Sequence, residues 1–150
     1  MPDNLIGKVA VITGGASGIG LGCVESFVAE GARVVVGDLS DERGAAVAER
    51  LGDAVEFVHA DVTDDSQVAG LVDRAVRRFG RLDVMFNNAA GAGDVAALVD
   101  LSPEGLDASP RLLVGSAVSG HRHAARLFRA QGSGGSIITT SSGAGLQGGW

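Results

Sequence analysis

The fold is decided by one glycine-rich stretch, Thr13-Gly14-Gly15-Ala16-Ser17-Gly18-Ile19-Gly20. An apolar run rich in β-branched residues precedes it at 8–13 and predicts a buried strand. Residues 19–30 follow with helical spacing, and the side chains expected on the inner side of that helix are Ile19, Cys23, Phe27 and Val28. The stretch therefore predicts a tight turn from a strand into a helix.

The same alternation continues along the rest of the chain. The sequence predicts further strands at 33–36, 55–59, 82–86 and 136–140, and further helices at 41–51, 66–79 and 121–130. We expect Ser66 to cap the third helix and the inner stripe of that helix to be Val68, Leu71, Val72, Ala75 and Val76. Residues 91–110 are rich in Gly, Ala and Asp, and they predict a loop.

Strands that alternate with helices predict an α/β fold with right-handed crossovers. The expected architecture is a doubly wound, Rossmann-like parallel sheet with strand order 3-2-1-4-5 and helices on both faces, in three α/β/α layers. The sequence shows no repeat or linker, so residues 1–150 are expected to form a single dinucleotide-binding domain.

Composition narrows the classes of function. Twelve basic and 18 acidic residues give a net charge of −6, which argues against nucleic acid as a partner. The single cysteine, Cys23, excludes an internal disulfide, and the spacing of His121 and His123 argues against a metal site. No apolar run is long enough for a membrane helix, and the first residues lack a signal-peptide pattern. We therefore expect a cytoplasmic protein with no membrane partner.

The glycine turn and Asp38 together suggest a dinucleotide site. Gly14 permits a sharp turn, Gly18 lets the backbone approach a pyrophosphate, and Gly20 allows close packing of the helix on the strand. Asp38 ends the second predicted strand 18 residues after Gly20, where a carboxylate binds ribose hydroxyls and repels a 2′-phosphate. No basic residue follows Asp38 directly, which favours NAD over NADP. The alternative is that Asp38 merely ends a strand.

At this point the chain resembles the short-chain dehydrogenase/reductase family, in its compact branch. The resemblance rests on the glycine spacing, on Asp61-Val62, on Asn87-Asn88-Ala89-Ala90 and on the run at 135–142. It implies an NAD-dependent oxidoreductase that transfers hydride between NAD(H) and a secondary alcohol or ketone. The family is usually homo-oligomeric, and the helix that builds its main interface is not among these residues.

The resemblance also assigns site residues. Ser142 corresponds to the catalytic serine that binds the reacting substrate oxygen, and Ser141 is an alternative bearer of that role. The non-functional alternative is that Ser142 is a serine in the turn after a strand. Asp61 and Val62 correspond to adenine contacts, Thr140 lies on the nicotinamide side, and Asn87 braces the sheet. The full set of implied cofactor-binding residues is Thr13, Gly14, Ser17, Gly18, Ile19, Gly20, Asp38, Leu39, Asp61, Val62, Asn87, Ala89 and Thr140.

Three departures from the family pattern leave two functions open. The family's catalytic tyrosine and lysine are missing, since the sequence has no tyrosine and its only lysine is Lys8. Its catalytic asparagine is replaced near Leu112 or Leu113, and Pro110 interrupts an expected helix between Gly105 and Gly115. One reading is an oxidoreductase sequence truncated before the Tyr-x-x-x-Lys pair. The other is a non-catalytic dinucleotide-binding pseudoenzyme or fragment.

Overall fold

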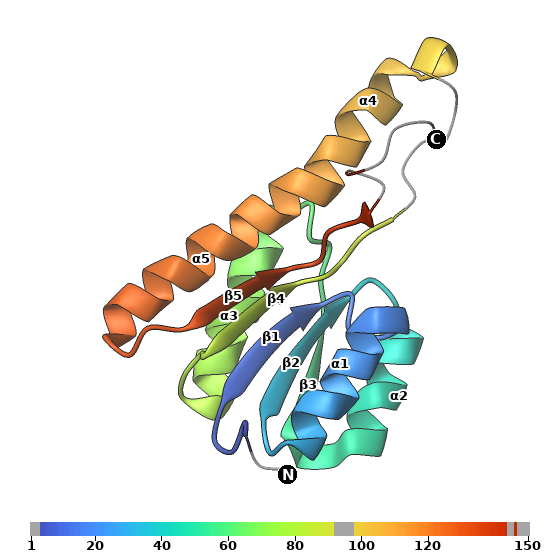
Figure 1. Ribbon diagram of the computed structural model, residues 1–150. Helices are drawn as coiled ribbons and strands as arrows, with labels where there is room; N and C mark the ends of the chain where they lie inside the picture. The colour runs from blue at the N-terminus through green and yellow to red at the C-terminus, as the bar shows by residue number, and fades with distance from the viewer. Residues whose placement is uncertain (1–3, 92–97, 144–145, 147–150) are drawn as a thin grey trace.

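The computed structural model describes residues 4–91, 98–143 and 146 (Figure 1). These residues contain five strands and five α-helices, which alternate up to β4, and α4 and α5 then both precede β5. The strands are β1 (Val9–Thr13), β2 (Arg33–Asp38), β3 (Val55–His59), β4 (Val84–Asn87) and β5 (Ser136–Thr139). The α-helices are α1 (Gly18–Ala29), α2 (Asp41–Leu51), α3 (Asp65–Phe79), α4 (Pro103–Pro110) and α5 (Ser116–Gln131). Two 3₁₀ turns, η1 (Gly52–Ala54) and η2 (Leu98–Asp100), and a π-helical turn, η3 (Arg111–Gly115), complete the order.

The five strands form one parallel sheet in the order β3-β2-β1-β4-β5, as the sequence predicts. In the central register, Val11 of β1 lies beside Val35 of β2 and Met85 of β4. Every side chain of β1 is buried, because helices cover both faces of the sheet at its centre.

Two apolar clusters hold the helices on the sheet. On one face, Val24 of α1 and Val47 of α2 pack with the β-strand residue Ile12. On the other face, Leu71 of α3 and Phe128 of α5 pack with β-strand residues of the other parity. Figure 1 shows α1 in front of the sheet and α3 behind it. The three-layer architecture follows from this alternation of side chains between the two faces.

Asp83, just before β4, contacts the start of β1 and the residues before β4, at the amino ends of the strands. Its carboxylate accepts hydrogen bonds from the Val9 amide at 3.0 Å and from Arg81 at 2.7 and 2.9 Å, and Lys8 lies 3.6 Å away. Burial alone would raise the pKa of Asp83, but the hydrogen bonds from Val9 and Arg81 outweigh it and lower the pKa overall. This ionised carboxylate fixes the start of β1 against the start of β4.

The predicted loop at 91–110 is wrong over Pro103–Pro110, which form α4; residues 92–97 lie outside the described part of the chain. The Ser102 side chain accepts a hydrogen bond from the Gly105 amide at 3.0 Å, and Pro103 occupies the first helical turn, where its missing N–H costs nothing. These start signals override the loop-like composition. The last predicted helix also begins earlier, at Ser116 rather than His121.

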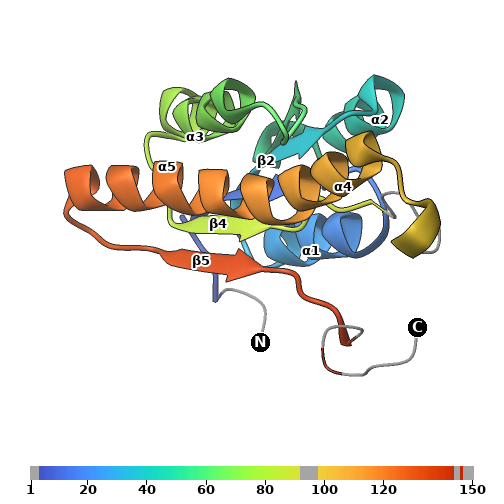
Figure 2. The same ribbon diagram turned by 90° about the horizontal axis from the view of Figure 1, so that it is seen from above.

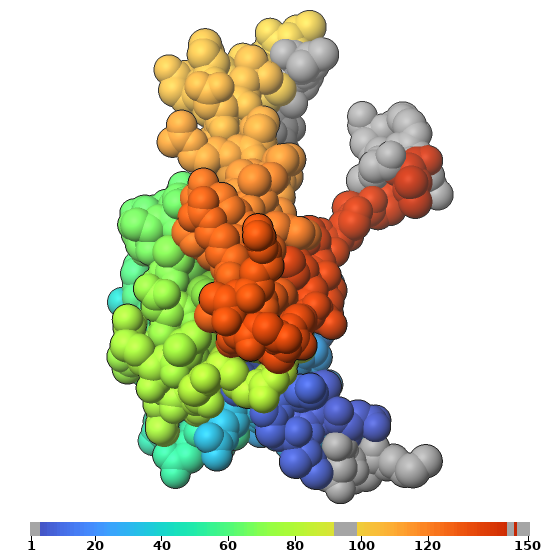
Figure 3. All heavy atoms as spheres, turned by 90° about the vertical axis from the view of Figure 1, so that its left-hand side faces the viewer, coloured from blue at the N-terminus to red at the C-terminus, as the bar shows by residue number. Residues whose placement is uncertain are grey.

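Pro110 does interrupt a regular helix, as expected, and the interruption is a π-helical turn. Proline cannot donate the hydrogen bond that would continue the α-helical pattern, and η3 follows it directly. The turn keeps α4 and α5 nearly continuous, and Figure 2 shows them as one long rod running beside β4 and β5. Figure 3 shows the α4 end of this rod rising clear of the body of the molecule.

Three local predictions need correction. Helix α3 is capped by Asp64, whose carboxylate accepts a hydrogen bond from the Ser66 amide at 2.9 Å, rather than by Ser66. Val76 is 36% exposed, because it lies at the margin of the buried stripe. Ile19 is 68% exposed, because it lies in the first turn of α1, beyond the edge of the core.

Candidate functional site

The main cavity, of about 530 Å³, lies beyond the carboxyl ends of the strands. The chain leaves β1 towards β2 on one side, whereas β4 flanks β1 on the other, so a crevice opens where the strand order reverses. Segments that are distant in sequence form its walls. The lining residues are Gly14, Ser17, Gly18, Ile19, Gly37, Asp38, Leu39, Arg43, Ala60, Asp61, Val62, Asn88, Ala89, Ala90, Gly91, Leu112 and Thr140.

The glycine turn forms one wall of the cavity, and at two of its positions the structure has no room for a side chain. Gly14 has φ +64°, and a Cβ there would lie 2.9 Å from the Cα of Ala89. A Cβ on Gly20 would lie 2.1 Å from the Gly14 carbonyl oxygen, so the close approach at Gly20 is to the turn itself. Gly18 has φ +53° and faces open space. At Gly14 and Gly18 the turn therefore presents backbone without side chains to the cavity.

The amino end of α1 gives this wall a positive character. Ser17 precedes the helix in an extended conformation, and its side chain makes no capping hydrogen bond. The first N–H groups of the helix keep their donors, and the helix dipole favours an anion in front of them. A pyrophosphate fits this wall.

Asp38 is held rigidly at the end of β2. It is 9% exposed, and its two carboxylate oxygens accept hydrogen bonds from the Ala16 and Ser40 amides, both at 3.0 Å. A carboxylate has about four acceptor positions, so two remain for hydroxyl groups in the cavity. The backbone contacts fix where those acceptors point.

The segment after β3 forms the opposite wall. The Asp61 carboxylate turns back to accept hydrogen bonds from the amide and hydroxyl of Thr63, at 2.8 and 2.7 Å. The Asp61 amide donates to Gln67 at 2.9 Å, which ties the segment to α3. Val62, 7% exposed, gives this wall an apolar surface suited to a flat ring.

Asn88 connects the parts of the site, a role that sequence reasoning missed. Its side-chain amide donates to the carbonyls of Thr13 at 3.1 Å and Gly14 at 3.4 Å, and its oxygen accepts from Thr140 Oγ1 at 3.0 Å. The Thr13 hydroxyl in turn accepts from the amides of Asn88 and Ala89. The position of Asn88 directly after β4, at the reversal of strand order, is the sequence signal that could have found it.

A second cavity of about 280 Å³ adjoins the first. Asn88, Ala89, Ala90 and Thr140 line both cavities. The second is also lined by Asn87, Leu113, Ser116, Ala117, Thr139, Ser141 and Ser142. Both candidate serines thus line the cavity next to the main one. Because η3 places Leu112 in one cavity and Leu113 in the other, the π-helical turn forms part of the partition between them.

An ion cluster centred on Asp65 lies beside this region. The Asp65 carboxylate accepts hydrogen bonds from Ser119 and His123 and pairs with Arg122, all from α5. The hydrogen bond from Ser119 is the main reason that the pKa of Asp65 is lowered. His121 turns elsewhere, to the Ala117 carbonyl at 2.7 Å. The cluster joins α3 to α5, and the described residues contain no group of three or more ligands able to hold a metal ion.

The expected site residues fall into three groups. Ten line the main cavity: Gly14, Ser17, Gly18, Ile19, Asp38, Leu39, Asp61, Val62, Ala89 and Thr140. Thr13 and Gly20 are buried behind the wall and support it. Asn87 and Ser142 line the second cavity.

None of the helices in the described ranges is long and apolar enough to span a membrane.

Comparison with known proteins gives matches over nearly all of the chain. The family model for short chain dehydrogenase matches residues 8–150. Momilactone A synthase of Oryza sativa subsp. japonica is 49% identical over 141 residues, which cover 93% of this chain and 51% of that protein. Tropinone reductase-like 2 of Erythroxylum coca is 43% identical, with 92% and 51% covered. 3beta-hydroxysteroid dehydrogenase 2 of Eggerthella lenta is 39% identical, and the match covers 95% of this chain and 56% of that protein. The chain spans about half the length of these relatives.

Proposed function

The chain belongs to the short-chain dehydrogenase/reductase family, and from that premise we propose that its main cavity binds NAD for hydride transfer to or from a secondary alcohol or ketone. The observation that carries the proposal is the cavity at the strand reversal, which joins a bare glycine turn to a fixed carboxylate. Family membership implies a nicotinamide dinucleotide, and the choice of NAD is our inference.

The walls of the cavity suit the parts of the dinucleotide. Gly18 and the first turn of α1 hold the pyrophosphate through backbone N–H groups, and Gly14 lets the chain turn sharply beneath it. Asp38 accepts hydrogen bonds from the adenosine ribose hydroxyls, and Val62 packs on the adenine ring. Ile19 and Leu39 line the cavity and are 68% and 62% exposed, and the bound dinucleotide covers them.

The anchoring of Asp38 supports NAD over NADP. Because the Ala16 and Ser40 amides hold both carboxylate oxygens, the side chain cannot turn away without losing two hydrogen bonds. A 2′-phosphate would then face a fixed negative charge from which little water screens it.

Chemistry takes place in the second cavity. The nicotinamide supplies or accepts the hydride when it is bound. Ser142, with Ser141 as the alternative, donates a hydrogen bond to the reacting oxygen of the substrate. Thr140, which lines both cavities and is tied to Asn88, marks the border between the nicotinamide and the substrate. The substrate is a small alcohol or carbonyl compound, and the relative named as a 3beta-hydroxysteroid dehydrogenase favours a cyclic one.

A second candidate function is dinucleotide binding without turnover. The sequence has no tyrosine to act as the family's acid and base, and Lys8 is its only lysine. Lys8 directly precedes β1, and its Nζ lies 3.6 Å from Asp83 Oδ1, at the amino ends of the strands and so at the opposite end of the sheet from the cavity. No lysine therefore reaches the proposed nicotinamide in these 150 residues.

Calorimetric titration of the chain with NAD and NADP tests the proposal. We expect one NAD to bind per chain and NADP to bind at least tenfold more weakly. Asp38→Asn should reduce this ratio of the two dissociation constants. Asp53→Asn, which changes an exposed carboxylate on η1, is the matched control and should leave the ratio unchanged. Absorbance at the NADH band with a panel of cyclic alcohols then separates turnover from binding alone. Failure to bind either dinucleotide would reject both candidate functions.

A further inference from the structure

A groove between strand β3 and helix α3, which we call the β3 groove, is a surface to which the proposed NAD site gives no role. Residues of β3, the edge strand of the sheet, line one side of it, and residues of α3 line the other. The groove has a volume of about 370 Å³. A Cβ added to Gly70 would meet nothing within 4 Å, so the α3 side is open at its middle. The lining residues are Phe57, Val58, His59, Gln67, Gly70, Arg74 and Arg77.

The backbone of β3 presents unpaired hydrogen-bonding groups at this edge. On the inner side of the strand, the Ala60 amide donates to the Asp38 carbonyl of β2 at 3.0 Å. In a parallel sheet the N–H and C=O groups of successive residues point to opposite sides of a strand, so those of Phe57 and His59 point away from β2. No described residue pairs with these outward groups. An extended segment could therefore add to the sheet here by main-chain hydrogen bonds.

The α3 side of the groove carries a positive charge that the described residues do not neutralise. Arg74 pairs with Glu56 of β3, and Arg78 pairs with both Glu56 and Asp53. Arg77 lines the groove in the last turn of α3, and its side chain forms no ion pair with any described residue. Its guanidinium donors thus remain for an acidic group in the groove.

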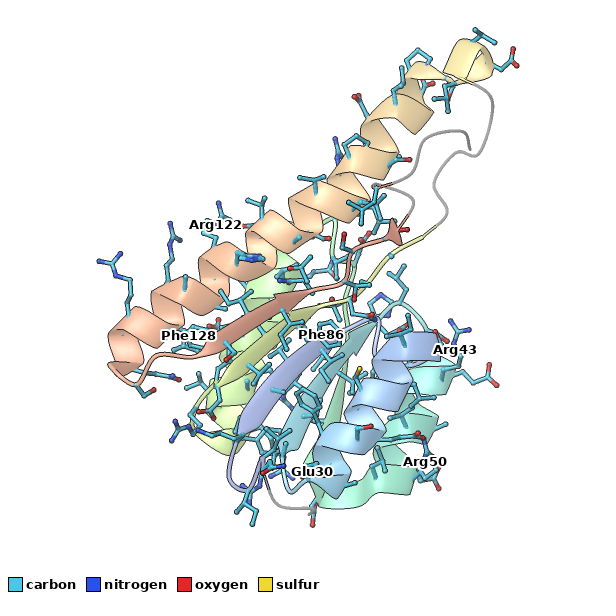
Figure 4. The ribbon with its side chains drawn as sticks, in the orientation of Figure 1. Glu30, Arg43, Arg50, Phe86, Arg122 and Phe128 are labelled. Atoms are coloured by element: carbon cyan, nitrogen blue, oxygen red, sulfur yellow. The ribbon has the colours of Figure 1, made fainter. Side chains whose placement is uncertain are left out.

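Several other arginines of the chain are neutralised within the fold. Arg50 of α2 pairs with Glu25 of α1, and Arg122 of α5 pairs with Asp65 of α3; both arginines are labelled in Figure 4. The whole chain has a net charge of −6, so the spare positive charge beside β3 is a local feature. A guanidinium matches a carboxylate with two parallel hydrogen bonds. Charge therefore favours a carboxylate as the group that Arg77 meets.

We propose that the β3 groove is a docking site for an extended acidic segment of a partner protein, which adds to the sheet as a further strand beside β3. The backbone of the segment pairs with Phe57 and His59, and a carboxylate side chain pairs with Arg77. Because side chains alternate between the two faces of a strand, carboxylates at every second position face α3. None of the groove residues lines either of the two cavities described above, so the inference does not depend on the NAD site.

Fluorescence anisotropy with a labelled peptide tests the docking site on the full chain. The probe is a capped peptide of about six residues, the usual length of a strand, in which glutamate and valine alternate. Arg77→Gln should weaken its binding about tenfold, the effect of losing one charge-assisted contact. Arg129→Gln removes the same charge from the last turn of α5, so it is the matched control and should leave the affinity unchanged. Circular dichroism checks that both variants are folded.

Altered peptides separate main-chain pairing from charge. A peptide with glutamine in place of glutamate should lose most of its affinity. N-methylation of the valine amides in one peptide, and of the glutamate amides in another, blocks the hydrogen bonds along one edge of the added strand each time. One of these two peptides should therefore lose binding while the other keeps it. Hydrogen exchange followed by NMR gives an independent measurement: the amides of Phe57 and His59 should exchange quickly in the free chain and become protected by the peptide.

Each contrary result overturns a defined part of the proposal. Absence of peptide binding, or equal binding by Arg77→Gln or by the glutamine peptide, refutes the acidic docking site. If both N-methylated peptides bind as well as the original, the segment does not add as a strand. If glutarate, a small dicarboxylate, competes at the same concentration as the peptide, the groove takes free anions only. Slow exchange of the Phe57 and His59 amides in the free chain would show that this edge is already covered.

Discussion

Two glycines of helix α1 offer a paired test of how the glycine turn is built. Gly20 and Gly22 are two residues apart in the same helix. A Cβ on Gly20 would lie 2.1 Å from the Gly14 carbonyl oxygen, whereas a Cβ on Gly22 would meet nothing within 4 Å. Both substitutions to alanine favour the helix by about 0.5–1 kcal/mol, because alanine loses less backbone freedom on folding. The difference between the two variants therefore isolates the close contact.

The magnitude follows from that contact. Ordinary van der Waals contact begins at 3.4 Å, so in Gly20→Ala the Gly14 carbonyl has to move by about 1.3 Å. Gly14 cannot yield freely, because its amide donates to the Gly37 carbonyl at 2.7 Å and its carbonyl accepts from Asn88. Overpacking of this kind costs about 1–3 kcal/mol. We expect Gly20→Ala to be less stable than Gly22→Ala by that amount.

Urea unfolding followed by circular dichroism measures the difference. With equal slopes, the two midpoints should differ by about 1 M. Calorimetry on the same samples should show NAD binding weakened about tenfold or more in Gly20→Ala, because the displaced turn no longer fits the pyrophosphate, and unchanged in Gly22→Ala. Equal midpoints together with equal NAD affinities would show that the turn does not depend on this contact.

Three further contacts are probed by substitution, with Gly70→Ala as the control for one of them. Asn88→Ala removes the hydrogen bonds that join the glycine turn to Thr140, directly after β5. Urea unfolding should show a loss of about 1–3 kcal/mol in the free energy of unfolding, and an unchanged midpoint would contradict this role. Gly120→Ala would place a Cβ 1.9 Å from Asn87 Oδ1 and should lower the thermal midpoint, whereas Gly70→Ala, in open space on α3, should raise it. Asp83→Asn should cost about 1–2 kcal/mol at pH 7. The pKa of Asp83 in the folded protein lies below the ordinary 3.8. Its contribution to the free energy of unfolding is therefore complete well above pH 3.8 and is lost as the pH falls through the folded pKa. The stabilities of the unaltered protein and of Asp83→Asn should accordingly converge in acid.

Much of the fold and part of the site could be predicted from local patterns. The order β3-β2-β1-β4-β5 follows from alternating strands and helices with right-handed crossovers. That order places the strand reversal beside β1, and hence the glycine turn and Asp38 in one cavity. These features depend on residues close together in sequence and on general rules of chain connection.

The errors arose where a distant or competing contact decides the outcome. Residues Pro103–Pro110 have the composition of a loop, but the Ser102 cap is enough to start a helix there. Ile19 has the spacing of a core residue, yet it lies past the end of the sheet and lines the cavity. Helical spacing reports which side chains share a face, and it does not report where the opposing layer stops.

The sequence by itself determined the parallel α/β fold, the position of the glycine turn and the acid at the end of β2. Only the tertiary structure decided that Asn88 joins the turn to Thr140, directly after β5, and that the Ala16 amide fixes Asp38. The physical reason is the range of the interactions. Periodicity and turn chemistry act within a few residues, whereas the contacts that shape the cavity join segments that meet only after the sheet has formed.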